Sequence, residues 1–219
     1  MTLPPSAARG PAPPPGITPR ERLLEAAVEA FAEKGFTATT TRDIANRAGM
    51  SPAAVYVHHD TKESLLFTVS VEGHQAALTV IRTAAALPTA AQGPAAPPGE
   101  GDHVARLRQM VRGFSTWHAV NSRVGRIVQY EFDALTPEHR AEIAGYRRRI
   151  ERVMRDVLSA GVDDGAFDVV DVPGTARAIL SLSIDLVRWF SPRGPHSADD
   201  IAQLHADLAV RMTTPRSHS

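Results

Sequence analysis

Two groups of side chains in this chain are of types that could do chemistry. The run His58-His59-Asp60 offers the nitrogen and oxygen donors that a metal ion takes. Neighbouring residues of a helix point in different directions, so these three side chains cannot chelate one ion without other ligands. We therefore expect no metal site.

The second group is a run of arginines on one predicted helix: Arg147, Arg148, Arg149, Arg152 and Arg155. Two interpretations are open. The run could be a solvated face whose charges pair with Glu151 and Asp156. It could instead bind an anionic group, such as the phosphates of a coenzyme A thioester.

The motifs of common enzyme classes are missing from the sequence. There is no glycine-rich phosphate loop, no G-x-S-x-G elbow and no zinc-type histidine spacing. There is also no cysteine, which excludes a thiolate zinc site, a cysteine nucleophile and a disulfide framework. We expect a protein that is not an enzyme and that uses no cofactor.

The charge balance limits how the chain could bind nucleic acid. Lys and Arg total 24 and Asp and Glu total 24, so the net charge is zero. A bulk polycation is excluded, and any contact with nucleic acid must be local and geometric. The sequence has no long apolar stretch for a transmembrane helix and no signal-peptide core. We expect a cytoplasmic protein without a membrane partner.

Helices alone are predicted to position these side chains. Aromatic residues make up only 5% of the chain, while Ala, Leu and Arg are common, which favours helix over strand. Thr18-Pro19, Ser51-Pro52 and Thr136-Pro137 each pair a capping residue with a proline in the first turn. We predict an all-α fold of about nine helices, over residues 18–35, 41–49, from 51, 61–86, 102–120, 122–133, 136–160, 173–190 and 198–213.

Two proline-rich segments interrupt this helical pattern. Residues 1–16 hold six prolines and are predicted to be a disordered tail. Residues 87–101 hold four prolines and three glycines and are predicted to be a flexible loop.

The stretch from Thr41 to Val55 has the spacing of two helices that cross. Ala45 supplies the small residue that two approaching backbones need. Gly49 tolerates the positive φ that the turn requires. An ordinary helical hairpin is the alternative. The side chains that we expect to face inward and fix the crossing are Ile44, Ala48 and Val55.

Residues 17–66 resemble the DNA-binding domain of the TetR family of bacterial repressors. The matching stretch is ITPRERLLEAAVEAFAEKGFTATTTRDIANRAGMSPAAVYVHHDTKESLL. It carries a helix ending AxxxFxxxGF, then TTxxIAxxAGxS, then a tyrosine and a KExL helix start. It departs from the family at Ala53, where many members have Gly, and at His59, where most have Phe. The resemblance implies a homodimer that places a helix of each subunit in the major groove of double-stranded DNA, with half-sites ~34–36 Å apart.

The resemblance also implies roles for individual residues. Arg42 corresponds to the family's base-reading residue, and an arginine there can bond both O6 and N7 of guanine. The residues that correspond to phosphate contacts are Thr40, Thr41, Tyr56, His58 and Lys62.

The predicted recognition helix is unusually apolar. Ser51 caps it, and it presents Pro52, Ala53, Ala54 and Val57, whose side chains can touch thymine methyls but cannot hydrogen-bond to bases. Direct readout is therefore expected to depend on Arg42, with DNA shape providing the rest.

Residues 17–66 are not basic overall, since they contain six Lys or Arg and seven Asp or Glu. Glu25, Glu29 and Glu33 should therefore face away from DNA. Binding should weaken with salt, but through few phosphate contacts.

Residues 67–214 are predicted to form the effector-binding and dimerisation domain. In the family the last two helices pair with their symmetry mates as a four-helix bundle, an arrangement that suits a twofold operator. Burial within one subunit is the alternative for some apolar positions. The candidate dimer residues are Ile179, Leu182, Leu186, Ile201, Leu204, Leu208 and Met212.

We expect an effector cavity among the fourth to eighth helices, lined by apolar and aromatic side chains. Ordinary core packing is the alternative for each, although His118 could orient a polar group. The segments GVDDGAF and RWFSPRGPHSADDIAQL resemble a TetR branch linked to fatty-acid and steroid catabolism, which favours an acyl-CoA. The candidate ligand residues are Met110, Phe114, Trp117, His118, Tyr130, Tyr146 and Met154, with Phe132 beside them.

Together these features predict a ligand-responsive transcriptional regulator. We expect a homodimeric repressor that binds a palindromic operator and is released by a small hydrophobic or anionic effector. The alternative is a helical interaction adaptor without specific DNA binding, which predicts no sequence-dependent DNA shift.

Overall fold

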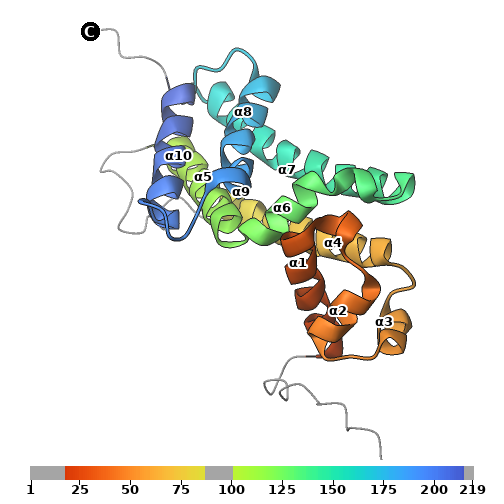
Figure 1. The fold of residues 1–219 in the computed structure, drawn as a ribbon. Coiled ribbons are helices and arrows are strands. Elements are labelled where there is room, and N and C mark those ends of the chain that lie inside the picture. Colours follow the sequence, from red (N-terminus) through yellow and green to blue (C-terminus); the bar gives the residue numbers. More distant parts are fainter. Residues whose placement is uncertain (1–17, 87–100, 215–219) are drawn as a thin grey trace, which may run out of the picture.

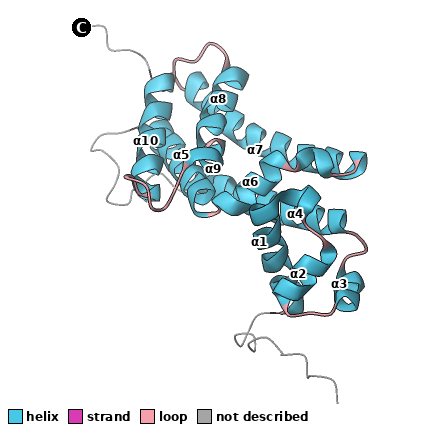
Figure 2. Ribbon diagram, in the orientation of Figure 1, coloured by secondary structure: helices cyan, strands magenta, loops and turns pink. Residues whose placement is uncertain are grey.

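The computed structural model describes residues 18–86 and 101–214, and within these ranges the regular elements are all helices (Figures 1 and 2). The predicted all-α class is confirmed. None of the helices described is both long enough and apolar enough to span a bilayer. The predicted tail at 1–16 and nearly all of the predicted loop at 87–101 lie outside the described residues.

The helices follow one another along the chain with short connections. They are α1 (Pro19–Ala38), α2 (Thr41–Ala48), α3 (Pro52–His58), α4 (Lys62–Ala86), α5 (Asp102–Val120), α6 (Ser122–Tyr130), the 3-10 helix η1 (Phe132–Ala134), α7 (Pro137–Asp163), α8 (Val172–Ile184), α9 (Leu186–Trp189) and α10 (Ala198–Thr213).

The predicted start of α1 is confirmed by a reciprocal cap. The amide of Glu21 donates to the Thr18 hydroxyl at 3.2 Å, and the amide of Thr18 donates to the Glu21 carboxylate at 2.8 Å. This arrangement satisfies two donors that a helix N-terminus otherwise leaves unpaired. Gly35, with φ of +75°, interrupts α1 where the sequence predicts its end.

A small bundle of α1, α2, α3 and the start of α4 stands at one end of the molecule, and α4 runs from it into the larger bundle (Figure 1). The small bundle has an apolar core contributed by all four helices. Side chains fully buried in it include Leu23, Ile44, Val55 and Leu65.

In the larger bundle α5 packs against α4 on one side and against α10 on the other, while α6 crosses from α1 to α9. Two glycines allow α6 to approach its neighbours closely. A Cβ on Gly73 of α4 would lie 2.9 Å from Val124, and a Cβ on Gly125 of α6 would overlap Val187. Glycine at both positions thus fixes α6 between α4 and α9.

Two predicted helices differ from the structure. The helix predicted over 173–190 is divided into α8 and α9 at Asp185, because the amide of Arg188 donates to the Asp185 carbonyl, three residues back. The helix predicted over 122–133 ends at Tyr130, and one turn of 3-10 helix follows it.

The predicted stop before Gly161 is wrong, because α7 continues to Asp163. Gly165, with φ of +74°, lies in the turn that follows the helix. Gly161 serves a different purpose: the ring of Phe167 folds back onto it, and a Cβ at this position would overlap the ring. A long-range contact, and not a local turn, therefore requires this glycine.

Gly161→Ala is expected to destabilise the protein by about 1–3 kcal/mol, because the methyl group must displace the buried Phe167 ring. Gly145→Ala is the matched control on the same helix, since its Cβ would meet only arginine side-chain ends at 3.8 Å. Removing glycine from an open helical site should stabilise by about 0.5–1 kcal/mol. Urea unfolding of both variants measures this, and two changes of equal sign would contradict the assignment.

Candidate nucleic-acid interface and internal cavity

The crossing of α2 and α3 is built as the sequence predicts. Ala45 is fully buried at the crossing, and Ile44, Ala48 and Val55 face inward as expected. Gly49 adopts the left-handed conformation with φ of +65°, and the next amide, that of Met50, donates to the Ala45 carbonyl at 2.9 Å. The two helices are therefore held in a helix-turn-helix arrangement.

The N-terminus of α2 brings several predicted DNA-contacting residues together. Thr40 caps the helix through Asp43, whose carboxylate accepts from the Thr40 amide at 2.9 Å and from its hydroxyl at 2.7 Å. These hydrogen bonds lower the pKa of Asp43 to about 2. The hydroxyl of Thr41 lies 3.2 Å from that of Tyr56, so α3 and the start of α2 share one hydroxyl-bearing surface.

Helix α3, the predicted recognition helix, presents apolar residues to solvent. Ser51 caps it by accepting from the Ala54 amide at 3.2 Å. Tyr56 is 51% exposed and Val57 is 81% exposed, large values for such side chains. Exposed apolar groups at this place are available to touch base edges. Pro52 and Ala53 are exposed beside them, and the predicted His58 contact lies outside the side chains described.

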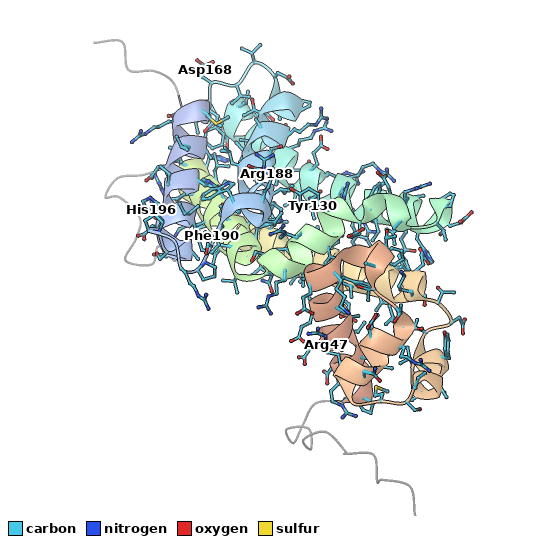
Figure 3. The ribbon with its side chains drawn as sticks, in the orientation of Figure 1. Arg47, Tyr130, Asp168, Arg188, Phe190 and His196 are labelled. Carbon is cyan, nitrogen blue, oxygen red and sulfur yellow. The ribbon has the colours of Figure 1, made fainter. Side chains whose placement is uncertain are left out.

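Two acidic side chains of α1 form ion pairs with one arginine of α2. Arg47 donates to Glu29 at 3.1 Å and also pairs with Glu33 (Figure 3). Arg42, by contrast, is exposed, and no carboxylate of the described residues lies within ion-pairing distance of it. The charge of Arg42 is thus available to an external partner.

Lys62 has a role that the sequence did not indicate. Its ammonium donates to the carbonyl oxygens of Phe36 at 2.7 Å, Thr37 at 3.3 Å and Thr39 at 2.7 Å. It also lies 4.2 Å from the centre of the Phe36 ring. An ammonium has three N–H donors, so its hydrogen-bonding capacity is used at the end of α1. A phosphate contact by Lys62 remains a prediction, and it would require the release of one carbonyl.

Glu63, the next residue, connects α4 to the larger bundle. Its carboxylate accepts from the Thr136 amide at 3.0 Å and from the His139 ring at 2.7 Å. A further connection comes from Glu131, the residue after α6, whose carboxylate accepts from the Phe36 amide at 3.0 Å. The helix-turn-helix unit is therefore tied to the larger bundle by two glutamates.

The larger bundle contains a partly open cavity of about 500 Å³ among α4, α5, α6, α7 and α8, the helices predicted to surround it. This size falls within the range of small-molecule sites, ~300–1,000 Å³. Three adjacent residues of α5 that the sequence singled out, Phe114, Trp117 and His118, line the cavity.

The other predicted ligand residues lie elsewhere. Met110, Tyr146 and Met154 are buried in the core and do not line the cavity. The placement of Tyr130 in the cavity is wrong, since its side chain is 58% exposed and borders a separate hollow beside α1 (Figure 3). Along a helix each residue is rotated by about 100°, so Val128 faces the cavity and Tyr130 does not.

The polar residues of the cavity were largely missed. They include His74 of α4, Arg147 and Glu151 of α7, and Arg177 of α8. Only the arginine run gave a signal. The exposure of most of the run agrees with a solvated face, but Glu151 pairs with Arg177 and not with the run, and anion binding stays a prediction. Arg148, Arg149, Arg152 and Arg155 are exposed, whereas Arg147 turns inward and is half-buried.

Two histidines in the cavity wall are neutral. The His74 ring bonds the Ser70 carbonyl and the His118 ring bonds the Phe114 carbonyl, each through Nδ1 at 2.8 Å. A carbonyl can only accept, so Nδ1 carries the proton and Nε2 is the acceptor. Burial lowers the pKa of both side chains to about 4.

The predicted dimer residues divide into two sets. Ile179, Leu186 and Ile201 are buried within the subunit, so their assignment to an interface is wrong. The remaining side chains, half-buried or exposed on α8 and α10, are available to a partner: Leu182, Leu204, Leu208 and Met212. The three on α10 follow at four-residue spacing and form a stripe on one face.

A helix-turn-helix unit joined to a helical bundle with an internal cavity is the architecture of a one-component DNA-binding regulator. Residues 23–69 match the family described as bacterial regulatory proteins, tetR family, and residues 100–213 match the tetracyclin repressor-like C-terminal domain. The chain therefore belongs to the TetR family.

Several relatives resemble this chain over most of its length. The repressor KstR2 of Mycobacterium tuberculosis H37Rv is 30% identical over 198 residues, which are 87% of this chain and 90% of KstR2. A tetR-family regulatory protein from Rhodococcus RHA1 is 40% identical with a TM-score of 0.78, covering 92% of this chain and all of that protein. AibR, solved with isovaleryl coenzyme A and operator DNA, shares the fold at 24% identity, with a TM-score of 0.74 and coverage of 91% and 100%.

The neutral histidines make stability depend on pH. Because the pKa of each falls from 6.5 to about 4 on folding, the unfolded chain binds more protons in this interval. The folded state should therefore lose stability as pH falls below 6.5, by on the order of 2 kcal/mol between about pH 7.5 and about pH 5.5 for the pair.

Urea unfolding of a His74→Asn/His118→Asn double variant over this pH range tests the effect. Asparagine keeps a donor near the Nδ1 position but does not titrate, so the pH dependence should flatten. His196→Asn, in an exposed loop (Figure 3), is the control and should leave the slope unchanged. A double variant with the parent's slope would refute the assignment.

Lys62→Met is expected to destabilise the free protein by about 1–3 kcal/mol, because carbonyl groups at the end of α1 lose their partner. Lys34→Met is the matched control, since Lys34 makes one exposed ion pair with Asp43 at 3.3 Å. Exposed pairs of this kind contribute about 0–1 kcal/mol. Thermal unfolding without DNA measures both. An unchanged melting temperature for Lys62→Met would leave phosphate binding as the role of this residue.

Proposed function

We propose that this protein is a homodimeric, ligand-responsive transcriptional repressor that binds a palindromic operator. The observation that carries the proposal is the exposed surface of the helix-turn-helix, where the charge of Arg42 lies next to the paired hydroxyls of Thr41 and Tyr56. Its connection to a bundle with an internal cavity supports regulation by a small molecule.

We assign base recognition to Arg42 and contacts with the DNA phosphates to Thr41 and Tyr56. The amide and hydroxyl of Thr40 both donate to Asp43, so a phosphate contact by Thr40 would require the release of one of these hydrogen bonds. A guanidinium in the first turn of a helix can form hydrogen bonds with both the O6 and the N7 atoms of one guanine. Hydroxyl and amide groups at a helix N-terminus suit phosphate oxygens. The apolar surface of α3 adds contacts to thymine methyls and shape recognition.

Residues 17–66 would then form the DNA-binding domain and residues 67–214 the effector and dimerisation domain. The stripe of Leu204, Leu208 and Met212 on α10 suits an interface with its own copy. Leu204 is 50% exposed and Met212 is 45% exposed. An isologous interface also matches the twofold symmetry of a palindrome.

An acyl-CoA is the first class of effector to test. Its support is the shared fold of AibR, which was solved with isovaleryl coenzyme A. The mixed apolar and cationic lining of the cavity agrees with such a ligand. A coupling free energy of about 1–3 kcal/mol between effector and operator would be enough to release DNA.

Fluorescence anisotropy at fixed salt tests the central proposal. Purified protein is titrated onto the DNA that flanks its own gene and onto scrambled DNA of the same composition. A preference of at least about a hundredfold, with two subunits per site, is expected for an operator-binding dimer. Binding that is weak and equally strong for the flanking DNA and the scrambled DNA would instead favour the helical adaptor without specific DNA binding.

Arg42→Ala should cost about 1–3 kcal/mol of operator binding and relax the preference at the guanine it contacts. The exposed loop residue Arg193 provides the control, because Arg193→Ala removes the same charge far along the chain. Fluorescence anisotropy with operators that differ at single bases measures the affinity of both variants. A uniform loss over all sequences would contradict base readout and indicate a phosphate contact.

A further inference from the structure

Arg147 carries the one fully buried side-chain donor of the cavity wall that has no hydrogen-bond partner within the described residues. Its Nη2 donates to the Val128 carbonyl of α6 at 3.3 Å, and its Cζ lies 4.3 Å from the centre of the Phe132 ring. Its Nε is buried and has no hydrogen-bond partner in the described part of the chain. One donor of a fixed, planar group therefore faces no acceptor.

An unmet buried donor is costly, and more so on a charged group. Burial lowers the pKa of Arg147, although an arginine stays protonated in proteins. The nearest carboxylate in the cavity wall, that of Glu151, pairs with Arg177 at 3.4 Å. An acceptor supplied by a ligand would offset the cost that Arg147 carries.

The charge of the cavity points in the same direction. Glu151 is paired with Arg177, whose side chain is 72% exposed, and His74 and His118 are neutral, so Arg147 is the unpaired charge of the cavity wall. The remaining wall is mainly apolar, with Phe114, Trp117, Ile150, Leu180 and Ile184. Such a cavity suits a molecule with an apolar chain and one negative end.

The geometry points to Arg147 as the residue that binds a negatively charged oxygen group of the effector, either a free carboxylate or a phosphate of a coenzyme A thioester. The inference rests on the proposed effector function of the cavity. It goes further by naming the chemistry of the bound group and the residue that selects it.

The binding mode follows from the shape of the guanidinium. Its Nε and Nη2 donors form one edge, and that edge can hold two oxygens of a carboxylate or phosphate at once. Nη2 has two N–H groups, so it can keep the Val128 carbonyl while it binds an anion, and the anion and α6 then contact the same arginine. The same helix is followed by Glu131, which bonds the Phe36 amide at the end of α1. Occupation of Arg147 is thereby linked to the helix-turn-helix.

Fluorescence of Trp117 tests the inference without DNA. The chain has two tryptophans, and in a Trp189→Phe background Trp117 in the cavity wall is the sole reporter. The probes are decanoate, decanoyl-CoA and decanol, which share a chain and differ in the charged end. We expect at least one anionic probe to bind at least tenfold more tightly than decanol.

Variants then assign the selectivity to Arg147. Arg147→Met should weaken the binding of the anionic probe at least tenfold and leave the binding of decanol unchanged. Arg147→Lys keeps the charge but loses the planar pair of donors, so it should lose part of the affinity for the anionic probe. This variant tests the inference if the methionine variant does not fold. Arg148→Met is the matched control on the exposed side of α7 and should have no effect.

The two arms identify the source of the oxygens. Arginine-dependent binding of decanoate indicates a carboxylate, and arginine-dependent binding of decanoyl-CoA alone indicates a phosphate. Equal binding of decanol and the anions, binding insensitive to Arg147, or no binding of any probe would each overturn the inference. Operator binding is measured in a separate experiment. If the protein still prefers its operator while any of these results is obtained, the inference about Arg147 fails and the proposal of a DNA-binding repressor stands.

Discussion

The relative placement of the two bundles depends on the first two residues of α4. Lys62 holds the carbonyl groups at the end of α1, and Glu63 holds the start of α7 through Thr136 and His139. Adjacent side chains of opposite charge therefore join the small bundle and the larger bundle at the N-terminus of α4. A movement of α4 at this point must change the setting of α2 and α3.

A second connection runs through α6. This helix lines the cavity with Val128, and the residue after its end, Glu131, bonds the Phe36 amide. Glycines at 73 and 125 bring α6 so close to α4 and α9 that it has little room to shift alone. A change at the cavity wall therefore has two contiguous routes to the same short segment, residues 36–39.

Features set by local sequence were predictable, and features set by packing were not. The capping pairs and the positive φ of Gly49 are local, so the helix starts and the helix-turn-helix followed from sequence. Gly161 is also a glycine near the end of a helix, but it is required by a tertiary contact, the packing of the Phe167 ring against it. Which face of α6 and of α7 turns toward the cavity depends on how five helices meet, and this packing sets the inward position of Arg147 and the outward position of Tyr130.

The scarcity of lysine gives the protein an unusual response to amine chemistry. Lys34 and Lys62 are the two lysines of the chain, and Lys62 has all its N–H groups turned toward backbone oxygens. Lys34 is 47% exposed. An acylating reagent would therefore attach a label to the Lys34 side chain well before Lys62, near the end of α1. That position lies beside the helix-turn-helix and would report its motion directly.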